Sequence, residues 1–105
     1  MKPKTLRALK GSIKKWKGVA DGTGVDRGPD NCPLCKLFWG DDCTGCPVAI
    51  KTGQKYCHGS PYDRWLDVAT ETVRPNVRVA VTAAAKRAAR AEVKFLKSLL
   101  PEESK

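Results

Sequence analysis

The arrangement of the five cysteines constrains this chain more than any other feature of its sequence. They lie at positions 32, 35, 43, 46 and 57 of 105 residues, and the first four form two Cys-x-x-Cys pairs. A Cys-x-x-Cys turn presents two sulfur atoms from one tight loop, and two such turns can supply a complete tetrahedral zinc site. The pattern therefore predicts one zinc ion bound in the middle of the chain.

Five cysteines compete for the four places around one such ion. Three of them are expected in every arrangement, namely Cys32, Cys35 and Cys46. Either Cys43 completes the set through a tight loop, or Cys57 replaces it and gives a looser ring. A closed site of four thiolates leaves no position for water, so the predicted Zn²⁺ is structural. His58 directly follows a candidate ligand and is interpreted as a surface residue.

Whether the cysteines bind metal or form disulfides depends on the cellular compartment of the protein. The longest apolar runs are far shorter than the roughly 20 residues that cross a bilayer, so no membrane association is expected. The basic start of the chain is followed by Arg7, Lys10 and Lys14, which interrupt the apolar segment of a secretory signal. We therefore expect a cytoplasmic protein, in which clustered thiols bind metal rather than form disulfides.

Two amphipathic helices are predicted on either side of the cysteines. Within residues 4–18, apolar side chains recur at helical spacing at Leu6, Leu9, Ile13 and Trp16. Residues 76–100 form the second, longer helix. Its apolar stripe is expected at Val77, Val81, Ala84, Ala88, Ala91, Phe95 and Leu99.

The segments between these helices complete a single domain of residues 1–105. The Cys-rich region at 21–60 holds most of the glycines and is predicted as zinc-organised turns. Ser60 and Pro61 favour the start of a further helix at 61–73, and residues 101–105 form a tail. The predicted fold is mainly α, with the N- and C-terminal helices packed as a helical hairpin or small bundle. A zinc-knuckle loop region with little or no β structure lies between them.

The net charge of +9 is concentrated in the two flanks of the chain. Residues 1–20 hold seven Lys or Arg and no acid, whereas residues 21–63 have more acids than bases. A basic surface is predicted from Lys14, Lys15, Lys17, Arg87, Arg90, Lys94 and Lys97. Such a surface suits non-specific phosphate contacts with nucleic acid, although solvated charges on exposed helix faces would give the same pattern.

The sequence also bears on functions other than nucleic-acid binding. One histidine, no Gly-rich phosphate loop and no nameable nucleophile–base pair give catalysis little to work with, so no enzyme is expected. A protein-interaction module for a host or phage protein is the alternative, as is a structural part of an assembled particle. A second apolar row on the last helix also favours a packing partner, including a second copy of the chain. This row comprises Ala89, Val93, Leu96 and Leu100.

Four segments also resemble small cysteine-rich proteins of bacteriophages and prophages that have no settled function. These segments are Ser12-Ile13-Lys14-Lys15-Trp16, Asn31-Cys32-Pro33-Leu34-Cys35, Cys43-Thr44-Gly45-Cys46-Pro47-Val48 and Cys57-His58-Gly59-Ser60-Pro61-Tyr62. The likeness spans residues 12 to about 66, and the ending at residues 95–101 fits as well. The resemblance implies a phage origin, a bacterial host cytoplasm and a zinc site at the matching cysteines, but no activity.

Overall fold

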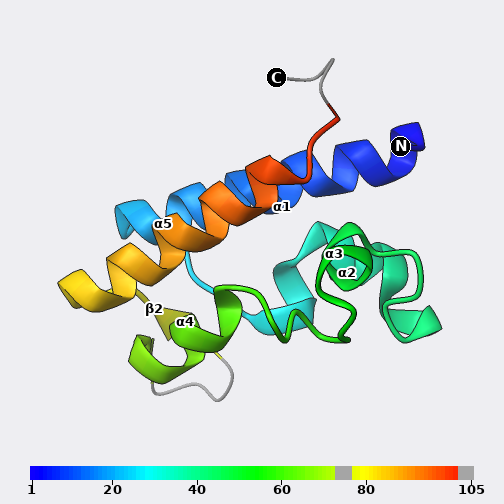
Figure 1. Cartoon of the computed structure of the whole chain (residues 1–105). Coiled ribbons are helices and arrows are strands. Elements are labelled where there is room, and N and C mark those ends of the chain that lie inside the picture. Colours follow the sequence, from blue (N-terminus) through cyan, green and yellow to red (C-terminus); the bar gives the residue numbers. More distant parts are fainter. Residues whose placement is uncertain (73–76, 102–105) are drawn as a thin grey trace.

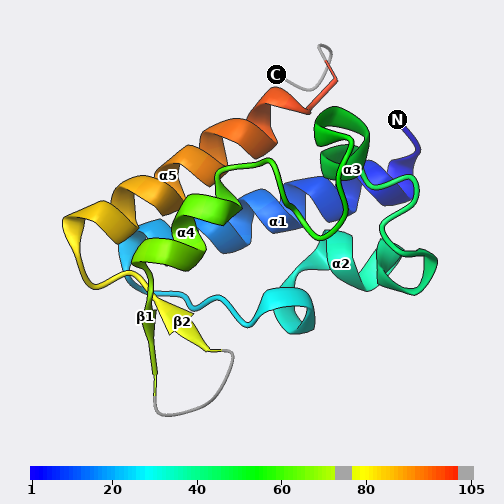
Figure 2. The same ribbon diagram turned by 60° about the horizontal axis from the view of Figure 1, so that its bottom comes forward.

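Helices α1 (Pro3–Asp21) and α5 (Ala83–Ser98) lie side by side and run antiparallel, forming the framework of the molecule (Figures 1 and 2). The structure is a computed structural model that describes residues 1–72 and 77–101. Little β structure accompanies the helices in this part of the chain. The predicted mainly α fold, with the N- and C-terminal helices packed together, is confirmed.

Helix α1 forms where the apolar spacing predicted it and extends slightly beyond residues 4–18. Leu9, Ile13, Trp16 and Val19 are buried along one face, as the helical period requires. The helix ends at Gly22, whose φ of 82° is left-handed and whose N–H reaches the carbonyls of the last turn. The glycine therefore stops the helix and turns the chain toward the cysteines.

The last helix begins at Ala83 rather than at residue 76, which corrects the predicted boundary. Strands β1 (Thr70–Glu71) and β2 (Arg78–Val79) form a short antiparallel hairpin before it, with Thr70 opposite Val79. The pattern Val-Arg-Val-Ala-Val at 77–81 alternates β-branched residues, which favours an extended chain over a helix. The Thr82 hydroxyl then accepts a hydrogen bond from the N–H of Ala85 at 3.1 Å and caps α5.

Helix α4 (Tyr62–Val68) is shorter than the predicted segment 61–73. Ser60 contributes to its start as expected, because its hydroxyl accepts a hydrogen bond from the N–H of Tyr62 at 3.2 Å. The helix stops because Ala69 adopts an extended conformation and leads the chain into β1. Residues 73, 75 and 76, at which the sequence placed helix boundaries, lie outside the described residues.

The Cys-rich region 21–60 contains short helices where turns were predicted. Its elements in chain order are η1 (Gly28–Asn31), α2 (Pro33–Phe38), η2 (Trp39–Asp41) and α3 (Pro47–Thr52). Proline occupies the first position of both α2 and α3, where its fixed φ suits a helix and its missing N–H costs nothing. The preceding residues, Cys32 and Cys46, are extended, as residues before proline prefer.

The buried face of α5 differs from the stripe that the sequence predicted. The residues that α5 buries are Ala85, Ala88, Ala89, Glu92 and Leu96. Val81 is 63% exposed, and Ala91 also faces solvent. Helices α1 and α4 cover the buried face. No helix in residues 1–72 and 77–101 is long and apolar enough to span a membrane.

Candidate metal centre and basic surface

The first cysteine pair is fixed on α1 by two neighbouring small residues. A Cβ atom at Gly11 would lie 2.9 Å from Cγ of Pro33, so only glycine permits α2 to approach this closely. Ser12 accepts a hydrogen bond from the N–H of Leu34 at 3.2 Å, and its Oγ lies 3.6 Å from Sγ of Cys32. The start of α2, with its two sulfur atoms, is therefore docked on the framework helix.

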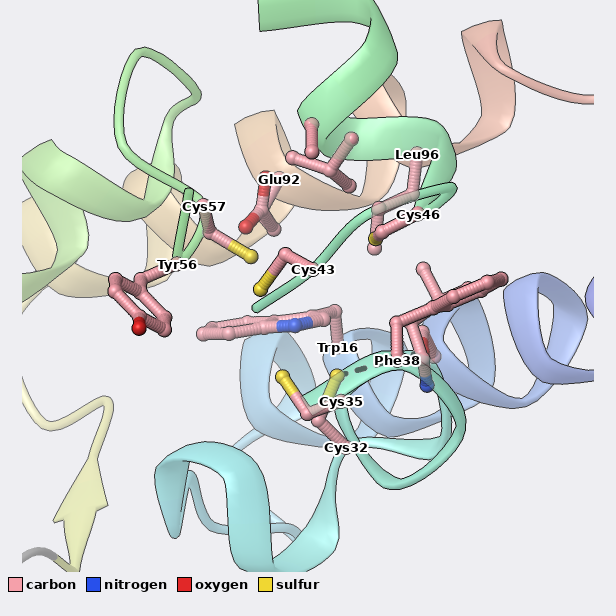
Figure 3. A pocket seen from close by; sticks show the side chains of 14 residues that line it. Trp16, Cys32, Cys35, Phe38, Cys43, Cys46, Tyr56, Cys57, Glu92 and Leu96 are labelled. Atoms are coloured by element: carbon pink, nitrogen blue, oxygen red, sulfur yellow. Dashed lines mark hydrogen bonds between the residues drawn. The ribbon is translucent and has the colours of Figure 1, made fainter. Parts of the chain in front are cut away.

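All five cysteines line one small cavity of about 20 Å³, and all are free thiols. Trp16, Phe38 and Leu96 contribute its apolar walls. Figure 3 shows the sulfur atoms of Cys43 and Cys57 on one side of the cavity and those of the Cys32–Cys35 pair on the other. A cavity of this size accommodates a single small occupant of roughly the volume of a water molecule.

The two contested cysteines have unusual backbone conformations. Cys43 and Cys57 both have φ of 65°, and each follows another non-glycine residue of positive φ, Asp42 or Tyr56. A left-handed conformation costs an L-residue about 1–2 kcal/mol. The surrounding structure thus holds both thiols at the cavity against a local preference, and the choice between them as fourth ligand stays open.

The thiols differ in how readily they lose a proton. A hydrogen bond from Cys35 lowers the pKa of Cys32 to about 5, whereas the pKa of Cys35 is raised because it supplies that bond and is partly buried. Burial raises the pKa of Cys46 and of Cys57. A metal ion would replace these protons, because zinc binds the thiolate form.

Glu92 is a member of this cluster that the sequence analysis missed. Its side chain enters the cavity from α5 and is 2% exposed. Burial, and then the neighbouring Cys32, raise the pKa of its carboxyl to about 8. Oε1 is the one buried side-chain nitrogen or oxygen in residues 1–72 and 77–101 without a hydrogen-bond partner. Leaving such an atom unpaired costs about 1–3 kcal/mol, so its position calls for an explanation.

The cysteine cluster contains donor atoms suited to zinc, but these atoms are not arranged in the coordination geometry of a zinc site. Within the described ranges, no three Cys, His, Asp or Glu side chains are arranged so that they could hold a metal ion. Binding would therefore require the side chains around the cavity to rearrange. Ordering a side chain costs at most about 2 kcal/mol, whereas structural zinc sites gain on the order of 10 kcal/mol. The five thiols thus match zinc in donor chemistry, while their arrangement in this structure is not that of a metal site.

The packing of α1 on α5 brings most of the predicted basic residues together. Two shallow grooves along the helix pair share Lys17 and Lys97 in their linings. We call their basic residues the basic face, which comprises Lys10, Lys14, Lys17, Arg90, Lys94 and Lys97. Asp21 is the one acidic side chain that lines either groove. Arg87 is also exposed on α5 but lines neither groove.

Lys15 does not belong to the predicted basic surface. Its side chain is 8% exposed, and Nζ forms an ion pair with Oδ1 of Asp26 at 2.9 Å. Its role is therefore to compensate a buried carboxylate rather than to meet a phosphate. The local sequence pattern does not indicate this pair, because Asp26 lies beyond the end of the helix that carries Lys15.

The aromatic residues divide between the core and the surface. Trp16 and Trp65 are buried, at 3% and 0% exposure. Phe38 is half-buried against the cysteine cavity, whereas Trp39 is 46% exposed and stacks at a tilt on Tyr56. His58 lies on the surface, where Nδ1 is 3.0 Å from Oδ1 of Asp63.

Comparisons with known proteins supply no relative. No protein-family model, curated protein or solved structure matches this chain. Its function has to be argued from the cysteine cluster and the basic face alone.

Proposed function

We propose that this protein is a small zinc-stabilised accessory protein that binds nucleic acid without base specificity through the basic face. The observation that carries the proposal is the convergence of exposed Lys and Arg side chains from α1 and α5 along two adjoining grooves. The two helices are far apart in the sequence, and their packing brings three basic residues from each onto one surface. The resemblance to phage proteins favours an origin in a phage genome.

The physical basis of such binding is phosphate neutralisation. Lysine and arginine contacts to phosphates release condensed counterions, and the resulting affinity falls steeply with salt. Contacts of this kind fix position on the nucleic acid but do not read its bases. The proposed interface is the whole basic face, and Lys15 is left out of it because it pairs with Asp26.

The proposed zinc ion has a structural role. Its ligands come from the Cys-rich region, which contains only short helices, and the region meets the framework through the contacts of α2 with α1. A bound ion would hold these short elements together, and its binding free energy would add to the stability of the fold. The framework that displays the basic face would then stay in one arrangement.

Salt-dependent binding of labelled DNA and RNA tests the proposal. We expect the affinity for a 20-nucleotide probe, measured by fluorescence anisotropy, to fall at least about 100-fold between 50 and 200 mM salt. The variant carrying Arg90→Glu, Lys94→Glu and Lys97→Glu should bind at least about 100-fold more weakly at low salt, because three phosphate contacts become repulsive.

A matched variant controls for net charge. Lys36, Lys51 and Arg64 are exposed and lie on α2, α3 and α4, outside the basic face. Reversal of these three to Glu changes the total charge equally but should weaken binding much less. Equal losses in the two variants, or an affinity that does not change with salt, would contradict the proposed interface.

A second candidate function is capture of a host or phage protein, and one observation favours it. A groove between the start of α1, α3 and the end of α5 is lined by Met1, Phe38, Ile50 and Leu99. Ile50 is 74% exposed and Met1 52% exposed, so apolar surface is available there. Substitution Ile50→Asp would abolish an apolar protein contact but should leave nucleic-acid binding intact.

A further inference from the structure

We propose that Oε1 of Glu92 is an oxygen ligand of the zinc ion, which it binds together with three of the five thiolates. The inference rests on the zinc site of the proposed function and assigns it a mixed sulfur–oxygen donor set. The proposed ligand lies on α5, a helix that the spacing of the cysteines does not predict to be part of the site.

Glu92 has one buried carboxylate oxygen, Oε1, without a partner, although the carboxyl group forms a hydrogen bond with Ser60. It lies on the face of α5 that packs into the core, and the cavity that it enters also contains all five sulfur atoms. Oε1 is buried without a hydrogen bond from any described residue. Figure 3 shows the carboxyl group on the same side of the cavity as Cys43 and Cys57. A zinc ion in the cavity would give this oxygen the partner it lacks, since carboxylate oxygen is an ordinary zinc ligand.

Ligation by Glu92 does not raise the charge that the site has to bury. Zinc with four thiolates carries about −2, and a protonated Glu92 beside it would add none. Lys15, whose charge acts on both Cys32 and Glu92, is paired with Asp26. With Glu92 as ligand and three thiolates, the complex keeps a charge of about −2. The remaining two cysteines then stay as neutral thiols, which pack as small apolar groups.

Ligation by Glu92 would join the Cys-rich region to the framework helix that carries the basic face. All five cysteines lie between residues 32 and 57, and Glu92 is the cavity's acidic residue on α5. Arg90 and Lys94 flank it in sequence and are exposed. The metal ion would therefore clamp α5 to the short helices from the buried side while its basic residues face outward.

Zinc-edge X-ray absorption on the full chain, loaded with one equivalent of zinc, tests the assignment. We expect three sulfur ligands at about 2.3 Å and one oxygen at about 2.0–2.2 Å. In the variant Glu92→Ala a spare thiol should replace the lost oxygen, so the fitted set changes to four sulfurs. A purely structural role for Glu92 would leave the donor set of the wild type and the variant identical.

The variant Glu92→Gln covers the case in which Glu92→Ala does not fold. The amide keeps the size of the side chain but is a weaker ligand, so a spare thiol should replace it and the fitted donor set should again change to four sulfurs. The matched control Glu71→Gln alters an exposed carboxylate on β1 and should keep the donor set of the wild type. Identical donor sets in the wild type and Glu92→Gln would overturn the assignment.

The outcomes separate this inference from the proposed function. A wild-type protein that binds one zinc through four sulfurs overturns the role of Glu92 and leaves the zinc site standing. A wild-type protein that binds no zinc overturns both.

Discussion

Asp26 is a fully buried carboxylate that joins three segments of the chain. It accepts hydrogen bonds from Nζ of Lys15 at 2.9 Å, Nε1 of Trp65 at 2.8 Å, the hydroxyl of Tyr62 at 3.0 Å and the N–H of Gly28 at 2.8 Å. Burial would raise the pKa of Asp26, but the charge and hydrogen bond of Lys15, with the other donors, outweigh it and lower the pKa below 3.8. The fold therefore stabilises the ionised form of Asp26.

Replacement of Asp26 should destabilise the protein in a pH-dependent way. Asp26→Asn removes the charge and leaves Lys15 buried and unpaired, for which we expect a loss of about 3 kcal/mol at pH 7. Because the folded-state pKa is lowered, the contribution of Asp26 is complete above 3.8 and is lost as the pH falls through the folded value. The difference in Tm between variant and wild type should thus shrink below about pH 4.

Thermal melts between pH 3 and pH 8 check this expectation. The exposed Asp30 provides a control, since Asp30→Asn should show little effect at any pH. Acid effects on the cysteine cluster are shared by all the proteins, so they cancel in the difference. A gap that stays constant down to pH 3 would show that Asp26 does not act through its charge.

Glycine substitution separates the structural and metal-binding roles of Cys43 and Cys57. Both residues have φ of 65°, which glycine adopts without strain. At a position that is not a ligand, the glycine variant should keep its zinc and change stability by no more than about 1 kcal/mol, because relief of backbone strain opposes the greater freedom of the unfolded chain. At a ligand position the same change should weaken zinc binding and lower Tm, as serine substitution should at Cys32, Cys35 and Cys46, because the zinc must then recruit a spare thiol. Metal content by elemental analysis, with the melting curve, reports both effects.

At the residue scale, the spacing of the cysteines correctly predicted that they share one site. The charge of Lys15 and Glu92 wrongly indicated that these side chains are exposed. Two Cys-x-x-Cys pairs indicate a shared site from sequence alone, and the structure places all five sulfurs around one cavity. Lys15 and Glu92 were not recognised as buried, because charged side chains are expected outside unless they are paired. The one available signal was position: Glu92 lies at helical spacing between Ala88, Ala89 and Leu96, on a face that must be buried.

At the scale of elements, the contact between α1 and α2 depends on a glycine inside a helix. Gly11→Ala would favour the isolated helix by about 1 kcal/mol, but the new Cβ would lie 2.9 Å from Pro33. Overpacking typically costs about 1–3 kcal/mol, so we expect net destabilisation. Because α2 begins at the first cysteine pair, its displacement should also weaken zinc binding, measured by chelator competition.

Gly18, a second glycine in α1, provides a control for the Gly11→Ala substitution. At Gly18 the nearest atoms to an added Cβ are 3.8 Å away, which is ordinary contact. Gly18→Ala should therefore stabilise the protein slightly, by the helix propensity alone. If the two substitutions changed stability in the same direction, the close approach of Pro33 would not be what selects glycine at position 11.

Periodicity predicted the elements well only where one pattern dominated. Helix α1 follows from the apolar spacing of its buried residues, and its end follows from Gly22. The stretch 77–81 was assigned to a helix because its valines also fit a helical stripe. Their alternation indicates a strand equally well, and the pairing with β1 and the bridge between Asp26 and Arg78 decide the outcome. Such long-range partners cannot be read from a local pattern.

At the scale of the whole molecule, the fold follows from the two terminal segments. Each segment forms a helix with one apolar face and with basic residues away from that face. Antiparallel packing of the two helices buries the apolar faces and brings the basic residues onto one surface. The position of the Cys-rich region could not be predicted in the same way. It depends on Gly11, Ser12 and Asp26, which are small or polar residues without any periodic signature.

The placement of the three tryptophans gives the protein its own optical reporters. Trp16 borders the thiols, and its ring centroid lies 5.3 Å from that of Trp65, so the emission of this pair would respond to the state of the sulfur atoms beside it. Trp39 is open to solvent, where a dissolved quencher can reach it. Loading of the cavity and events at the surface could thus be followed in one cuvette, without any attached dye.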